Sequence, residues 1–290
     1  MSNPIAEPIK HQSKMKFAKI LHVLANDPLL CAADYRASLL EMFRQHAELS
    51  AADFRAERTG LAKSGQELDI RQMEIEDGIA RIPVGGPIGQ DLGEFEKGAG
   101  AVDVDDIRSE IEQAEDDDEV EAIVLDFDSP GGQVTGTPEL ANYIIADVEK
   151  PIYAFCRGSM CSGAYWLACA CDGIFCTPSS TVGSIGVCLV FNDLSKAADM
   201  AGVKVKVFAS GPFKSTGTAG TSLSADQEIF LRARVTELAD NFYSHVRANR
   251  PDVQDDDMQG QLYTGTTALA KGFVDDVMEY NDLLAFLKAS

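Results

Sequence analysis

Residues 120–128 read VEAIVLDFD, a nearly continuous run of apolar residues. Such a run is typical of a strand covered on both faces, as in a parallel sheet between helices. PELANYIIADV at 138–148 then predicts a helix, and PIYAFC at 151–156 predicts a second strand. Repeated units of strand and helix indicate an α/β fold with a mostly parallel sheet and helices outside it.

The same alternation extends from about residue 71 to the C-terminus. The Asp-Gly step in MEIEDGIARIPV at 73–84 predicts a β-hairpin. Further strands are expected in GIFCTP at 173–178, IGVCLVF at 185–191 and VKVKVF at 203–208. Further helices are expected in SGAYWLACAC at 162–171, in DLSKAADMAG at 193–202 and over 224–249, followed by a final helix-strand-helix from Thr266.

The first 68 residues have a different character. Residues 14–26 and 33–47 have helical apolar spacing, and a charged stretch follows them. We therefore expect a small helical N-terminal segment with a linker at 1–68 and a single domain at 69–290. His11, His22 and His46 are too scattered for a metal site, so surface or interface packing is expected for them.

The charge of the chain excludes one class of partner. The formal net charge is −21, with 46 acidic and 25 basic residues, and such a surface repels a nucleic-acid backbone. The acids concentrate at 103–121, which could be a cation site or the solvated face of a helix. The run lacks the central glycine of an EF-hand loop, so the solvated helix is predicted.

No apolar run approaches the ~18–20 residues that span a bilayer, and the chain does not open like a secretory signal peptide. The expected location is therefore the cytoplasm, where thiols stay reduced. The five cysteines between 156 and 176 form no Cys-x-x-Cys pair, and in a helix Cys169 and Cys171 would point about 200° apart. We predict buried apolar packing for the thiols and no metal or cofactor, with a Cys161 nucleophile as the alternative.

Ser162 is a candidate nucleophile. It follows the strand PIYAFC and a tight turn, and it would begin the next helix, where unpaired N–H groups can stabilise an oxyanion. A simple helix cap is the other interpretation, and position alone favours it. The Gly-x-Ser-x-Gly elbow is absent, since Met160 and Ala164 occupy the glycine positions.

A serine nucleophile needs a base. His245 is the only histidine outside the N-terminal segment, and it lies among charged residues of a long helix. A lysine can replace histidine if burial lowers its pKa from about 10.4 toward neutrality. Lys214, between glycines in SGPFKSTG, is the candidate, with an ordinary surface lysine as the alternative. A phosphate loop is excluded because Phe208 and Phe213 stand where that motif needs glycine.

After the candidate nucleophile and the candidate base, a third motif of interest is DSPGGQV at 128–134. Paired glycines allow the backbone N–H groups of Gly131 and Gly132 to converge on a negative charge. A plain turn explains the motif equally well when it is taken alone.

Together and in order, five motifs resemble the signal peptide peptidase A and protease IV family of serine peptidases. They are DSPGGQV, PIYAFCRGSMCSGAY, TPSSTVGSIGV, SGPFKS and YTGTTALAKGFVDDV, and they cover about residues 70–280. The resemblance implies a Clp protease/crotonase-like fold of stacked, mostly parallel sheets with outer helices.

The resemblance also implies residue roles. Ser162 would be the nucleophile and Lys214 the general base of a Ser-Lys dyad. The remaining implied roles belong to the oxyanion-hole glycines Gly132 and Gly163, to Gly131, a weaker assignment that shapes the turn, and to Ser184, which would orient the lysine.

Within this family the chain resembles the head maturation (capsid assembly) proteases of tailed phages, because it has the helical preamble LANDPLLCAADYRASLL and no anchor. That branch implies a homo-oligomer that processes scaffold or capsid protein in the host cytoplasm or the procapsid. Since the sequence ends at Ser290, any scaffold is expected to be encoded separately or lost. The alternatives are a host signal-peptide-peptidase-like protease, an acyl-CoA hydratase-like enzyme and an inactive capsid-assembly module.

Overall fold

The computed structural model describes residues 29–31, 72–98 and 100–289. The expected helices at 14–26 and 33–47, the three N-terminal histidines and the boundary near residue 68 lie outside the described residues. Of the two expected parts, the second is therefore the one whose structure can be followed.

The main sheet confirms the α/β prediction. Its strands lie in the order β11-β10-β8-β6-β3-β2, with β9 paired to β8 and β12 paired to β9. All pairings are parallel except β2 with β3 and β10 with β11, at the two edges. The strands are β2 (Glu74–Glu76), β3 (Ile79–Gly85), β6 (Ala122–Ser129), β8 (Ile152–Cys161), β9 (Gly173–Cys176), β10 (Thr181–Gly183), β11 (Leu262–Thr264) and β12 (Asp276–Val277).

The central strand β6 explains why its sequence is apolar throughout. Ile123, Leu125 and Phe127 face the principal core, whereas Val124 belongs to a second cluster with Leu283 of the C-terminal helix. Both faces of the strand are thus covered, and alternation between apolar and polar residues is lost for that reason.

A second, smaller sheet has the order β1-β7-β4-β5. Its strands are β1 (Leu29–Cys31), β4 (Ile88–Gly89), β5 (Val102–Asp103) and β7 (Gly131–Gln133). Because β7 begins two residues after β6 ends, this sheet starts at the carboxyl end of the central strand of the main sheet.

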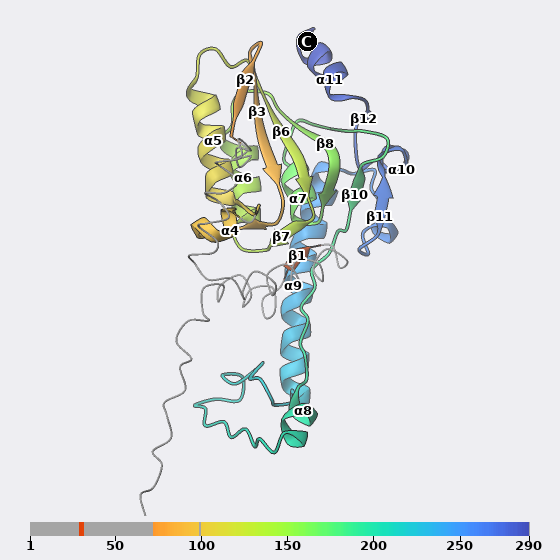
Figure 1. The fold of residues 1–290 in the computed structure, drawn as a ribbon. Helices are drawn as coiled ribbons and strands as arrows, with labels where there is room; N and C mark the ends of the chain where they lie inside the picture. The colour runs from red at the N-terminus through yellow and green to blue at the C-terminus, as the bar shows by residue number, and fades with distance from the viewer. Residues whose placement is uncertain (1–28, 32–71, 99, 290) are drawn as a thin grey trace, which may run out of the picture.

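Helices lie against the two sheets, except α8, which Figure 1 shows away from both of them. They are α4 (Glu94–Gly98), α5 (Val104–Asp116), α6 (Thr137–Asp147), α7 (Gly163–Ala168), α8 (Ser195–Met200), α9 (Ala225–Asn249), α10 (Gly265–Ala270) and α11 (Tyr280–Leu287), with a short 3-10 turn at Asp255–Asp257. The acidic run is confirmed as a solvated helix, because α5 buries its apolar stripe against the core. None of the helices in the described ranges is long and apolar enough to cross a bilayer.

The hairpin prediction is also confirmed, with Asp77 and Gly78 at φ 51° and 80° in the turn between β2 and β3. Two strand predictions are wrong. The segment 185–191 forms no strand, since the strand there is β10 just upstream, and residues 203–208 have no regular secondary structure. Residues 203–208 belong to an arm, residues 188–230, that runs away from the sheet toward α8 (Figure 1). A strand needs a neighbour to accept its backbone hydrogen bonds, and the sheet is out of reach there.

Candidate active site

Ser162 lies at the sharp turn between β8 and α7. Its backbone has φ 55° and ψ −114°, a conformation that is strained for a residue with a Cβ atom. The turn is held from β10, because the Ser162 N–H donates to the Gly183 carbonyl over 2.8 Å while Cys161 pairs with Gly183 in the sheet. The turn is therefore an elbow, although the sequence lacks the glycines of the usual elbow motif.

The Ser162 hydroxyl does not cap the helix. The side chain makes no capping hydrogen bond, and Oγ is buried without a hydrogen-bond partner among the described residues. Ser162 is only 1% exposed. A buried polar group without a partner typically costs about 1–3 kcal/mol of stability. The Ser162 side chain therefore does not stabilise the helix as a capping side chain does. The helix-cap alternative loses its support.

The glycine pair lies beside Ser162. In the main sheet Ser129 of β6 pairs with Met160 of β8. Two residues beyond this pair, the first strand leads to Gly131 and the second to Ser162. A Cβ atom on Gly132 would lie 1.9 Å from the Ile88 carbonyl oxygen, so only glycine fits at that position.

The two glycines differ in how their N–H groups are used. Gly131, at φ 92°, donates its N–H to Ser129 Oγ over 3.2 Å, and Ser129 Oγ donates in turn to the Gly86 carbonyl over 2.6 Å. Gly131 therefore shapes the turn and its N–H is engaged. Ser129 was not among the residues predicted from the sequence, although its place directly before Pro-Gly-Gly was a usable signal.

Ser184 reaches the same end of the sheet from β10. It follows Gly183, has φ 55°, and its N–H donates to the Gln261 carbonyl over 2.6 Å. The structure thus brings together Ser162, Gly163, Gly132 and Ser184 from three separate motifs.

Lys214 is not part of this group within one chain. It lies in the arm, where the tilted rings of Phe213 and Phe230 are 5.1 Å apart and the Gln227 side chain donates to the Pro212 carbonyl over 2.6 Å. The helix α7, in contrast, meets α9 at Phe242, whose ring lies 4.5 Å from that of Trp166.

The length of α9 separates these two contacts. At 1.5 Å per residue, Phe230 and Phe242 are about 18 Å apart along the helix. Figure 1 shows α9 running from the arm to α7. A lysine side chain is much shorter than this separation, so Lys214 and Ser162 of the same chain do not meet in this conformation.

His245 is half-buried and engaged elsewhere. Its Nε2 lies 2.9 Å from the Trp166 carbonyl oxygen, and its ring stacks on Trp166 at 5.5 Å. Burial lowers the pKa of the imidazole. Helix carbonyls point toward the C-terminal end, so this contact lies away from the Ser162 end of α7.

The thiols pack as predicted. Cys156, Cys161, Cys169 and Cys176 are buried, Cys171 is partly buried, and all five are free thiols. Burial raises the pKa of Cys169 to about 12 and of Cys176 to about 11, which keeps both thiols protonated. The Cys161 thiol donates to the Thr181 carbonyl over 3.5 Å, so this alternative nucleophile is engaged in the core.

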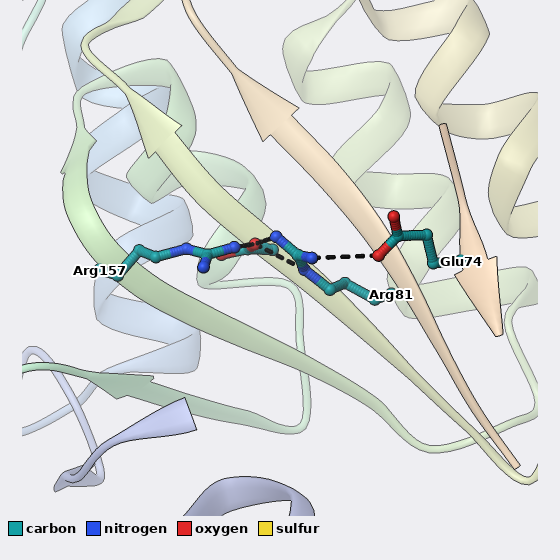
Figure 2. Close-up of polar contacts among 4 residues, drawn as sticks. Glu74, Arg81 and Arg157 are labelled. Atoms are coloured by element: carbon teal, nitrogen blue, oxygen red, sulfur yellow. Dashed lines mark hydrogen bonds and ion pairs between the residues drawn. The ribbon is translucent and has the colours of Figure 1, made fainter. Parts of the chain in front are cut away.

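A separate charged cluster lies on the face of the main sheet that Tyr280 and Leu283 of α11 contact, and Figure 2 shows its side chains. Asp126 of β6 is buried and accepts hydrogen bonds from Arg81, at 2.8 Å from Nε, and from Arg157. Arg81 also pairs with Glu74 at 3.2 Å, and both guanidinium groups lie within 6 Å of the Tyr280 ring of α11. These contacts tie four strands, β2, β3, β6 and β8, to the C-terminal helix, and we assign the cluster to stability.

Comparison with known proteins bears on the same site. Residues 145–290 match the sequence model of peptidase family S49, a range that includes Ser162, Ser184 and Lys214. The chain is 27% identical over 285 residues to the head-tail preconnector protein GP5 of Enterobacteria phage P21, covering 92% of this chain and 56% of that protein.

Two further relatives carry protease names. Identity is 29% over 235 residues with the capsid assembly protease C of Escherichia phage lambda, covering 79% of this chain and 53% of that protein. It is 29% over 195 residues with protease 4 of Salmonella typhi, covering 66% of this chain and 31% of that protein. The chain spans about half the length of the two phage relatives.

Proposed function

Because the chain belongs to peptidase family S49, we propose that it is a serine endopeptidase in which Ser162 attacks the peptide carbonyl. The observation that carries this proposal is the Ser162 hydroxyl itself. It is held in a strained elbow beside a glycine pair, and it has no hydrogen-bond partner in the described part of the chain. Strained backbone of this kind concentrates at functional sites.

The proposed reaction uses a Ser-Lys dyad. Neutral Lys214 takes the proton from Ser162 Oγ as the oxygen bonds to the carbonyl carbon, and the N–H groups of Gly132 and Gly163 hold the resulting oxyanion. Protonated Lys214 then donates to the leaving amine, and water hydrolyses the acyl-enzyme by the same steps. Ser184, next to Gly183 at the elbow, is proposed to orient the lysine.

We further propose that Lys214 acts on Ser162 of a second copy. Two observations support this: the separation along α9 within one chain, and the apolar surface of the arm. Phe208 and Met200 are 94% and 90% exposed, and Ile229 is 66% exposed. Monomeric proteins rarely leave such groups of apolar side chains open to water, so a homo-oligomer built through the arm would cover them.

The proposed substrate class follows from the relatives. Their names include capsid assembly protease and head-tail preconnector protein. We propose that this chain processes scaffold or capsid protein during phage head maturation, in the host cytoplasm or the procapsid, with residues 69–290 as the peptidase domain and 1–68 as an N-terminal segment.

Labelling with a serine-directed fluorophosphonate tests the nucleophile. We expect the wild-type chain to be labelled at Ser162, located by peptide mass spectrometry, and Ser162→Ala to be neither labelled nor active on casein. Lys214→Ala should lose casein hydrolysis as well. Absence of label on the wild-type chain, with casein hydrolysis unchanged in both variants, would contradict the proposal.

A further inference from the structure

The chain places its own segment against the strand that carries Gly132. One edge of β7 pairs with β4, where Ile88 lies opposite Gly132. The other edge pairs antiparallel with β1, and the register sets Leu30 opposite Gly132. Leu29 lies opposite Gln133 and Cys31 opposite Gly131 on the same edge. Both edges of β7 are therefore occupied.

A peptide substrate would need the edge that β1 occupies. Its scissile carbonyl must lie next to Ser162 and within reach of the Gly132 N–H, and extended peptides commonly bind enzymes by adding a strand to an exposed edge. The β4 edge of β7 is internal to the small sheet. The β1 edge is the one along which an added strand could run past Gly132.

The state of Ser162 agrees with an occupied site. The residue is 1% exposed, so an external peptide cannot reach its hydroxyl in this conformation. The helix α7, which begins directly after Ser162, packs against β7. A strand on the edge of β7 therefore lies close to the nucleophile.

We infer that Leu29–Cys31 binds in the place of a substrate strand and competes with external peptides for the edge of β7. The inference rests on the proposed function and extends it in two ways. Substrate enters only after β1 leaves, and it binds antiparallel to β7 with its N-terminal side toward Gln133 and its C-terminal side toward Gly131. A three-residue strand makes few ladder hydrogen bonds, which suits a reversible occupant.

The test is a double substitution, Leu29→Pro with Leu30→Pro, in the full chain. Successive residues of a strand direct their N–H groups to opposite sides, so one of these two donors faces β7 whichever the register. Proline removes both donors. We expect KM for fluorescein-labelled casein to fall about tenfold with kcat unchanged, as for removal of an occupant present in about nine molecules of ten.

The chain offers a matched control, since Leu39 and Leu40 form a second Leu-Leu pair in the same N-terminal segment. The double proline substitution at 39 and 40 should leave KM unchanged. A synthetic peptide of residues 25–35, ANDPLLCAADY, should inhibit the 29/30 variant competitively, and a scrambled peptide should not.

Fluorophosphonate labelling in the same samples distinguishes failure of the competing-strand proposal from failure of the peptidase proposal. An unchanged KM in the 29/30 variant, with Ser162 still labelled, would overturn the competing strand and leave the peptidase standing. Absence of Ser162 labelling in wild type and variant alike would overturn both.

Discussion

The body of the molecule (residues 72–187 and 231–289) and its arm treat apolar residues in opposite ways. In the body, Ile82, Phe127 and Phe155 are fully buried. In the arm, Phe208 is 94% exposed, and Phe213 and Phe230 share one ring contact while remaining 45% and 48% exposed. The body buries these large apolar side chains within one chain. The arm carries apolar side chains that nothing described in the same chain covers.

The comparison also separates the two halves of the proposed chemistry. The elbow with Ser162 and the glycine pair belongs to the body, and its geometry is fixed by sheet pairing with β6 and β10. Lys214 belongs to the arm. Assembly of copies would therefore complete the site and bury the arm in one event, which couples activity to oligomerisation.

The largest effect is expected from Phe208→Ser. The substitution removes nothing buried in the single chain, but a central aromatic anchor of an interface is commonly worth about 2 kcal/mol, or about 30-fold in affinity. We expect the oligomer to dissociate at a higher protein concentration than the wild-type oligomer does, as measured by light scattering. Casein hydrolysis should be lost in parallel. Ile145→Ser is the matched control, since Ile145 is 51% exposed on α6 of the body. Equal losses in both variants would remove the distinction between arm and body.

A smaller effect is expected from Asp126→Asn, which acts within the body. The change leaves Arg81 and Arg157 facing each other without the buried carboxylate between them. Because both arginines are partly exposed, we expect a loss of about 2 kcal/mol in the free energy of unfolding rather than the 3–5 kcal/mol of a fully buried pair. Denaturant unfolding measures the loss. Glu74→Gln should cost less than about 1 kcal/mol, since Glu74 is exposed.

The smallest effect concerns pH. Burial, with a smaller contribution from Asp106, raises the pKa of Glu110 from 4.5 to about 7. A carboxyl whose pKa is raised on folding stabilises the fold most at low pH, so its contribution is lost as pH rises from about 4.5 to about 7. Glu110→Gln should therefore raise the unfolding free energy at pH 8 by about 1 kcal/mol or less, and flatten its fall over that window. If the wild-type unfolding free energy rose relative to that of Glu110→Gln between pH 4.5 and about 7, the assignment would be contradicted.

The sequence predicted the body well because its patterns are local. The apolar run of β6, the Asp-Gly turn at Asp77 and the long helix α9 each carry their signal within a few residues. The predicted strands at 185–191 and 203–208 failed for a physical reason: alternating or continuous apolar residues show that a segment will be covered, but not whether the cover is a sheet of the same chain.

The site was predictable in part. Motif order pointed to Ser162, Gly132 and Ser184, and sheet register brings these residues to one end of the main sheet. The hydrogen bonds of Ser129, the support from Gly183 and the pairing of β1 with β7 were not predicted, because each joins segments far apart in sequence without a local pattern. The proposed pairing of Lys214 with Ser162 of a second copy is beyond the reach of any single-chain pattern.

Mixing two inactive variants tests the shared site most directly. Ser162→Ala retains Lys214, and Lys214→Ala retains Ser162, so a mixed oligomer contains both groups on different copies. After co-refolding of the two variants in equal amounts, we predict recovery of casein hydrolysis and fluorophosphonate labelling of the Lys214→Ala copies alone. Mixed oligomers that remain inactive, while each variant assembles normally, would contradict a dyad formed between copies.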